Sequence, residues 1–196
     1  KQTAVHDADI VFVALSSWLA QEARKSPITR GKPIQVIPNP IDTGIFSPYP
    51  REAARHELGL SPKKKILLFG GLNPLRNPNK GYEELTSALE RLPPSLTASL
   101  ELVVFGTNSE PPPGISRISP RIFGFIDDRT RLAKLYSAAD VTIVPSRVES
   151  FGKVAAESLS CGTPVVAFAA SGLLDVVNHQ ENGYLAAPFV AEDLAA

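Results

Sequence analysis

The sequence has few of the residues that mark several common protein classes. Its 196 residues include one cysteine, Cys161, so no disulfide forms within the chain, which agrees with a reducing compartment. Its three histidines, His6, His56 and His179, show no metal-ligand spacing. No apolar run approaches the roughly 20 residues that a membrane span needs. Twenty basic residues balance twenty acidic ones, so the net charge gives no reason to expect nucleic acid as a partner. An anionic ligand would have to be held by a local site.

The rest of the composition is that of a globular chain. Hydrophobic residues make up 43% and charged residues 20%, which is enough apolar material for a sizeable core. From Lys65 onward, short apolar runs alternate with helical patterns. This alternation predicts an α/β fold, a parallel sheet with helices on both faces. The expected strands are 66–69, 100–105, 121–125, 141–144 and 165–168, and the expected helices are 81–92, 128–138 and 151–160.

The segment before Lys65 has its own pattern. Its expected elements are a buried strand at 9–14, a helix at 18–25, a second short strand at 34–37 and a short helix at 51–58. Ser16 or Ser17 could cap the first helix. The run Pro38-Asn39-Pro40 excludes a helix, because a residue before proline is kept out of the α region, so we place a linker there. Residues 1–4 do not resemble a signal peptide.

Ligands of an open parallel sheet bind beyond the carboxyl ends of its strands, so the loops at that edge matter most. The expected loops are 70–80, 106–114, 126–128, 145–152 and 169–173.

The first of these loops combines glycines with two cations. Gly71 follows a strand and lets the backbone approach a bulky ligand. Lys80 enters at a helix start, where amides and the helix dipole favour an anion. Together with Arg76, Lys80 suits a diphosphate. The fingerprints of the common phosphate loops are absent, and a flexible loop with solvated charges is the alternative.

The loop at 145–152 leads into a helix with two glutamates eight positions apart, Glu149 and Glu157, around Gly152. Helical side chains lean toward the helix N-terminus, so Glu157 can point back at the mouth of the helix. The apolar pattern places Glu157 at the border of the inward face. In the alternative interpretation Glu157 pairs with Lys153 on the surface, worth about 0.2–0.5 kcal/mol, and Glu149 is solvated.

A wider set of residues extends this pattern: Ala139 to Ser146, Glu149 to Gly152, Glu157, Cys161 to Val166, Ile37 to Asp42, Phe46, Lys80-Gly81, Gly124, Ile126-Asp127, Gly172 and Asn182-Gly183. Together these residues resemble the donor-site signature and interdomain linker of retaining glycosyltransferases of family 4. The resemblance covers almost the whole chain. It implies the GT-B fold, two Rossmann-like domains facing across a cleft, of which this chain would be the C-terminal donor domain with a doubly wound parallel sheet.

The resemblance also implies a role for each matching residue. Glu157 would hydrogen-bond the ribose hydroxyls, and Glu149, the expected catalytic residue, would bind hydroxyls of the donor sugar. Lys80 would neutralise the diphosphate. The family's arginine after the first strand is replaced by Leu72-Asn73, which leaves the role of Arg76 open. The other expected donor-binding residues are Gly71, Arg76, Phe125, Ile126, Ser150, Phe151, Gly152 and Lys153.

The resemblance predicts a remnant of an acceptor domain at 1–32, a linker and leading strand at 33–50, and a nucleotide-sugar-binding domain at 51–196 that stops before its closing helix. The expected parent enzyme is a retaining hexosyltransferase that uses a UDP- or GDP-sugar in polysaccharide biosynthesis. We expect neither metal nor cofactor, and its partners would be the nucleotide-diphosphate sugar and the missing N-terminal acceptor domain. The fragment alone is expected to be inactive. The expected location is the cytoplasm, with peripheral membrane attachment of the full-length protein left open.

Two other interpretations stay open. A sugar-nucleotide epimerase of GT-B architecture would carry histidines and carboxylates for proton transfer, and no such set can be assigned. A non-catalytic nucleotide-binding module would bind the nucleotide without transferring a sugar. Cys161 and Trp18 are expected to pack rather than react, and Ser146 has no neighbouring general base in the sequence, which argues against a hydrolase nucleophile.

Overall fold

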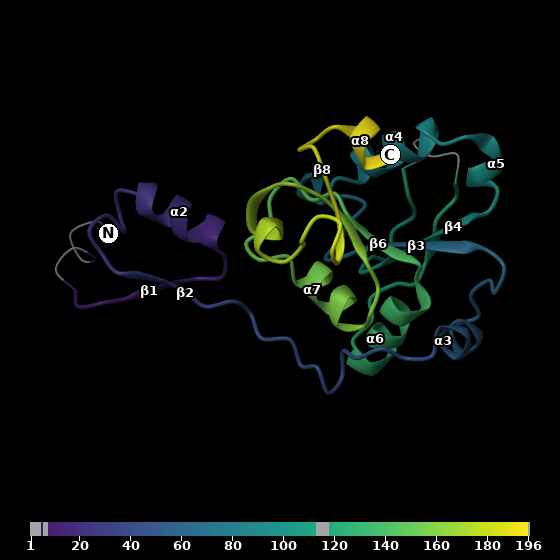
Figure 1. Cartoon of the computed structure of the whole chain (residues 1–196), viewed down its shortest axis with the longest axis horizontal. Helices are drawn as coiled ribbons and strands as arrows, with labels where there is room; N and C mark the ends of the chain where they lie inside the picture. Colours follow the sequence, from purple (N-terminus) through teal and green to yellow (C-terminus); the bar gives the residue numbers. More distant parts are fainter. Residues whose placement is uncertain (1–4, 6–7, 113–117, 196) are drawn as a thin grey trace.

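The computed structural model describes residues 5, 8–112 and 118–195, so His6, residues 1–4 and the end of the 106–114 loop lie outside it. Figure 1 shows a small N-terminal unit, joined by an extended segment to a larger α/β unit. Each unit has its own sheet, one of two strands and one of six.

The small unit consists of β1 (Phe12–Ala14), α2 (Ser17–Lys25) and β2 (Ile34–Val36). The two strands are parallel, and Ser16 caps α2 by accepting a hydrogen bond from the Leu19 amide at 3.1 Å. The prediction of a buried strand at 9–14 is wrong in extent and in burial. Only three residues pair, and Val13 is 55% exposed because one face of this sheet is uncovered.

The large sheet has six parallel strands in the order β5-β4-β3-β6-β7-β8. The strands are β3 (Lys65–Gly70), β4 (Leu100–Phe105), β5 (Arg121–Ile122), β6 (Val141–Val144), β7 (Val165–Phe168) and β8 (Gly183–Ala186). The chain begins in the middle at β3, moves outward to β5, and returns to β6 on the other side of β3. This is a doubly wound sheet, and the α/β prediction is confirmed.

Helices cover both faces of this sheet (Figure 1). The helical elements are α3 (Arg51–Glu57), η1 (Pro78–Lys80), α4 (Tyr82–Arg91), α5 (Pro94–Thr97), α6 (Arg129–Ala138), α7 (Lys153–Ser160), η2 (Ser171–Asp175) and α8 (Ala191–Ala195). Successive side chains of a strand point to opposite faces. Accordingly, Ile66 and Leu68 of β3 pack with α3 and α6, whereas Phe69 packs with α4.

The predicted strand at 121–125 is too long, and β5 stops at Ile122. The chain turns at Gly124, whose φ is +72° and whose carbonyl accepts a hydrogen bond from the Gly106 amide at 2.7 Å. The sequence interpretation also missed β8, α5 and α8, which have at most five residues each and therefore show little periodicity.

Asp140 fastens α3 to the amino edge of the sheet. Its carboxylate lies 2.6 Å from the Arg55 guanidinium and accepts a hydrogen bond from the Ile66 amide at 2.8 Å. Burial raises the pKa of Asp140, but the Ile66 amide and Arg55 together outweigh burial and hold this pKa below its ordinary value. This network lies at the end of the strands opposite to the candidate site.

Candidate functional site

The strand order reverses between β3 and β6, which are neighbours in the sheet. The connections that leave these two strands run in opposite directions, and ligands of doubly wound sheets bind at the carboxyl ends of the strands at such a switch point. Gly71 follows β3 at this point, and Pro145 follows β6. The loops predicted to carry the chemistry therefore meet at the switch point of the sheet.

Glycine lets the two loops approach one another closely. Gly81 has a φ of +73°, and a Cβ atom there would lie 1.9 Å from the Pro145 carbonyl oxygen. Beside it, the Arg147 amide donates a hydrogen bond to the Asn79 carbonyl at 2.9 Å. The loop after β3 is thus fastened along the loop after β6, and no residue with a side chain fits at position 81 without separating them.

Lys80 and Glu149 come together where these loops meet. The Lys80 Nζ lies 2.5 Å from Glu149 Oε1, and the Ser146 hydroxyl donates to the same oxygen at 2.9 Å. Both side chains of the pair are less than one-fifth exposed. The Lys80 stem lies over Gly71, where an added Cβ would be 3.3 Å from Lys80 Cε. The alternative of a solvated Glu149 is therefore wrong.

The start of α7 is open to an anion. Its N-cap is Gly152, which provides no side-chain cap, and no acidic residue occupies the first turn. The first-turn amides have no acceptor within the helix, and the helix dipole favours negative charge there. Lys153 stands at this start with a largely exposed side chain. This arrangement can bind phosphate oxygens beside the Lys80 ammonium group.

Glu157 lies on the second turn of α7 and is 6% exposed. The prediction that it lies at the border of the inward face is wrong, because the Tyr136 hydroxyl of α6 reaches Glu157 Oε2 at 3.1 Å and draws it inward. Lys153 lies 3.6 Å from the other oxygen, so the pair of the alternative interpretation exists as well. Burial raises the pKa of Glu157, and Tyr136 and Lys153 oppose this effect.

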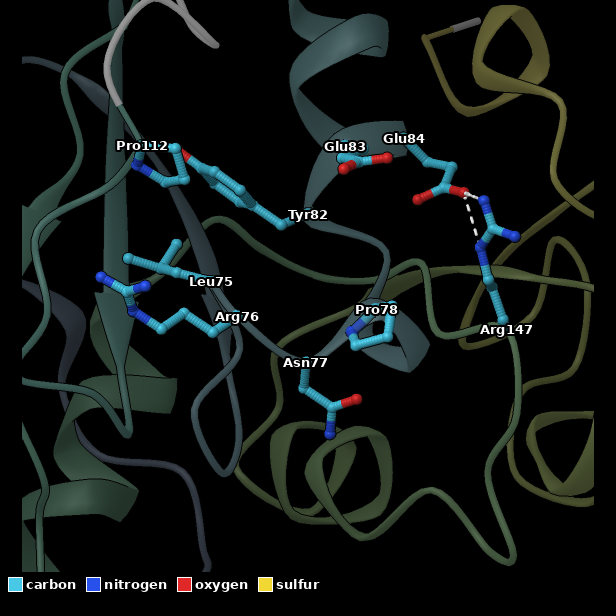
Figure 2. Close-up of a pocket in the computed structure, with 9 residues that line it drawn as sticks. All are labelled: Leu75, Arg76, Asn77, Pro78, Tyr82, Glu83, Glu84, Pro112 and Arg147. Carbon is cyan, nitrogen blue, oxygen red and sulfur yellow. Dashed lines mark hydrogen bonds and ion pairs between the residues drawn. The ribbon is translucent and has the colours of Figure 1, made fainter.

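Arg76 lines a pocket that Lys80 does not line. It lines a pocket of about 330 Å³ with the first turn of α4 and Pro112, and Lys80, Glu149 and Glu157 are not among the lining residues. In Figure 2, Arg76 lies on the side of Pro112, away from the ion pair between Arg147 and Glu84. The structure does not bring Arg76 together with Lys80, and its donor role stays a prediction.

The remaining expected donor residues divide into backbone and side-chain positions. Ser150 is exposed, and its backbone lies against Gly172, where an added Cβ would be 2.7 Å from the Ser150 carbonyl. Phe151 is buried beside Gly152 at the start of α7. Phe125 is 48% exposed, whereas Ile126 packs against the core cluster that contains Phe46.

Three polar partners of these residues were missed by the sequence interpretation. The Ser146 hydroxyl donates to Glu149, the Ser171 hydroxyl accepts from the Glu149 amide at 2.9 Å, and Tyr136 donates to Glu157. Ser146 follows a strand within the quoted motif, so its position gave a signal. Ser171 and Tyr136 reach the site only through tertiary packing.

Two further properties concern the described residues as a whole. In residues 5, 8–112 and 118–195, no cluster of three or more His, Cys, Asp or Glu side chains could hold a metal ion. Over the same part of the chain, no helix is both long and apolar enough to cross a membrane.

Comparison with known proteins identifies the family. The family described as "Glycosyl transferases group 1" matches residues 50–196. The chain belongs to this family. This group 1 glycosyltransferase chain is 38% identical over 164 residues to D-inositol 3-phosphate glycosyltransferase of Segniliparus rotundus. The match covers 78% of the chain and 35% of that relative, so the chain spans about a third of the relative's length.

Solved structures place the glycosyltransferase chain in the GT-B fold. Sucrose-phosphate synthase from Thermosynechococcus elongatus is 29% identical with a TM-score of 0.81, covering 99% of this chain and 49% of that one. The Anabaena protein HepE in complex with UDP is 25% identical with a TM-score of 0.74, covering 98% of this chain and 53% of that one. The sheet is thus the Rossmann-like, doubly wound sheet of GT-B glycosyltransferases.

Proposed function

We propose that this chain is the nucleotide-sugar-binding half of a retaining hexosyltransferase, and that its donor is a UDP-sugar. The observation that carries the proposal is the Lys80–Glu149 pair at the switch point, next to the open start of α7. A cation, a carboxylate and helix-start amides at one switch point suit a ligand that joins a diphosphate to a polyhydroxyl ring. The choice of UDP follows HepE, which was solved with UDP.

The diphosphate binds to the first-turn amides of α7 and to Lys80. An incoming phosphate gives the Lys80 ammonium a second anionic partner, so it competes with Glu149 for the same cation. The carboxylate of Glu149 then accepts hydrogen bonds from the hydroxyls of the donor sugar. Glu157 accepts hydrogen bonds from the ribose, toward which its position on the second turn of α7 directs it.

During transfer the bond between the anomeric carbon and the phosphate oxygen breaks, the oxygen of an acceptor hydroxyl bonds to the same face of the anomeric carbon, and the hydroxyl proton passes to the departing diphosphate. Negative charge develops on the departing diphosphate. Lys80 and the α7 amides stabilise this charge, and because they are fixed by the loops they require little reorganisation. The acceptor is held by the part of the protein that its longer relatives possess in addition. The residues of this chain alone therefore do not position an acceptor beside the donor, and we expect the chain to transfer no sugar.

The proposal is tested by calorimetric titration of the chain with UDP, UDP-glucose and GDP, each with and without EDTA. We expect weak binding of UDP and UDP-glucose, weaker binding of GDP, and no effect of the chelator. Absence of binding by all three ligands would contradict the proposed function. Binding that disappears with EDTA would contradict the metal-independent role of Lys80. Transfer by the complete protein, followed by NMR of the product's anomeric configuration, tests retention.

A further inference from the structure

Tyr136 connects the interior of the domain to the carboxylate of Glu157. It lies on α6 and is fully buried, and its hydroxyl donates a hydrogen bond of 3.1 Å to Glu157 Oε2 on α7. The backbone of Tyr136 is fixed as well, because the Thr163 hydroxyl donates to its carbonyl at 2.8 Å. The Tyr136 residue that donates this hydrogen bond is therefore held in the core.

The ring of Tyr136 is held between two other aromatic rings. Phe105 at the end of β4 meets it edge-on with centroids 5.7 Å apart, and Phe46 of the linker does so at 6.2 Å. Phe46 is 1% exposed and Phe105 is 6% exposed, so both neighbouring rings are buried. Close packing of buried rings favours one rotamer of Tyr136, which keeps its hydroxyl directed at Glu157.

The second oxygen of Glu157 is held less firmly. Lys153 Nζ lies 3.6 Å from Oε1, and the side chain of Lys153 is 62% exposed, compared with 7% for Glu157. A long exposed side chain is easily displaced from a contact at this distance. Tyr136 thus holds Oε2 of Glu157 from α6, and Oε1, which faces Lys153 in the first turn of α7, can still accept a hydrogen bond from a ligand.

Charged and titratable groups face Glu157 from two helices. Tyr136 and Arg129 approach from α6, and Lys153 with Cys161 from α7. Burial, followed by the charge of Glu157, raises the pKa of Tyr136 well above its ordinary value, so the tyrosine stays a proton donor. Loss of its hydrogen bond would let burial raise the pKa of Glu157 further.

We infer that Tyr136 is a positioning residue for donor binding, which orients the Glu157 carboxylate so that its free oxygen accepts the ribose hydroxyls. The inference rests on the proposed function. Tyr136 has no contact with the ligand in this account and acts only through Glu157. Its contribution comes from fixing the acceptor before the ligand arrives.

The variant Tyr136→Phe keeps the ring and removes only the hydroxyl. We expect UDP to bind roughly threefold to tenfold more weakly, the usual worth of one hydrogen bond. The acid pH at which binding fades should move upward, because the pKa of Glu157 rises. In a Glu157→Gln background the same change should cause no further loss, since residues that act as a unit are not additive.

Tyr82→Phe is the matched control. Tyr82 is also buried, and its hydroxyl has no hydrogen-bond partner among the described residues. Its ring stacks on Phe69 at 5.8 Å, so the substitution keeps the aromatic packing. This variant should keep both the affinity for UDP and its pH profile, and thermal melting of all variants confirms that they fold.

Unchanged affinity and pH profile in Tyr136→Phe would overturn the inference. An equal further loss in the Glu157→Gln background would do the same, because Tyr136 would then act through general packing. If the wild-type chain bound no UDP, the proposed function would fail instead. A carbon-13 NMR titration of the Glu157 carboxyl group would then decide the inference separately: the same pKa in wild type and Tyr136→Phe would contradict it.

Discussion

The Nζ atom of Lys80 lies 2.5 Å from Oε1 of Glu149, although 69 positions separate the two residues in the sequence. The ion pair spans the switch point of the sheet and joins the loop after β3 to the loop after β6. Ser146 also donates to Glu149 Oε1, so the carboxylate is oriented from two sides. The cation that the sequence assigns to the diphosphate and the carboxylate that it assigns to the sugar are direct neighbours.

Replacing Lys80 with alanine should weaken binding of UDP and of UDP-glucose alike. The expected loss is about 1.5–3 kcal/mol, the worth of a hydrogen bond to a charged group. The loss should be larger at low salt, where the charge is least screened. Titrations at two salt concentrations check this, with Lys63→Ala as the control, because Lys63 is an exposed lysine just before β3, at the opposite edge of the sheet. Equal losses in both variants would contradict a specific phosphate contact.

Glu149→Gln should distinguish binding of the sugar from binding of the nucleotide. The amide removes the negative charge beside Lys80, so bare UDP should bind at least as well as to the wild type. UDP-glucose should bind more weakly, because a neutral acceptor makes the weaker hydrogen bond with the sugar hydroxyls. The ratio of the two dissociation constants, measured by calorimetry, is the relevant quantity. A ratio equal to that of the wild type would remove Glu149 from the sugar site.

Gly81→Ala should disturb the junction of the two loops. The new Cβ would lie 1.9 Å from the Pro145 carbonyl oxygen, in addition to the strain of a φ near +73°. Gly31→Ala is the matched control, with a φ of +77° and no atom within 4 Å of its new Cβ. The control should cost about 1–2 kcal/mol of unfolding free energy. Gly81→Ala should cost more and also lower the affinity for UDP, which denaturant titration and calorimetry measure.

Asp140→Asn tests the network at the amino edge of the sheet. At neutral pH it should lower the unfolding free energy by about 1.5–3 kcal/mol, the worth of a hydrogen bond to a charged group, since Arg55 loses its charged partner. The folded pKa of Asp140 is lowered, so its contribution is complete above the unfolded pKa, near 4, and is lost as the pH falls through the folded value. The stability difference between wild type and variant should therefore narrow below about pH 4. Affinity for UDP, at the far edge, should not change.

The sequence was sufficient for the central sheet because its parallel strands are buried on both faces and read as continuous apolar runs. The strands at 66–69, 100–105, 141–144 and 165–168 were predicted to within one residue at each end. The small unit was harder: the pattern at 9–14 predicts burial, but the structure leaves Val13 exposed. Burial there depends on what covers the sheet, which local sequence does not encode.

The site was predicted in part for a comparable reason. Glu149 and Lys80 were found because glycines and strand ends mark their loops, and Glu157 because helical side chains lean toward the helix start. The pairing of Lys80 with Glu149 and the contact of Tyr136 with Glu157 are tertiary relationships between separate elements. Periodicity within one helix places a residue on a face, but it does not specify which residue of another helix lies opposite.

Titration of Glu157→Gln with UDP shows whether a nucleotide site lies at the carboxyl edge of the sheet. The substitution keeps the size of the side chain and leaves Tyr136 a hydrogen-bond acceptor, so the fold should persist. Loss of the charged acceptor for the ribose should weaken UDP binding by about 1.5–3 kcal/mol. Lys63→Ala, which changes an exposed lysine at the opposite edge of the sheet, should leave the UDP affinity unchanged. Unchanged UDP affinity in Glu157→Gln would contradict the account.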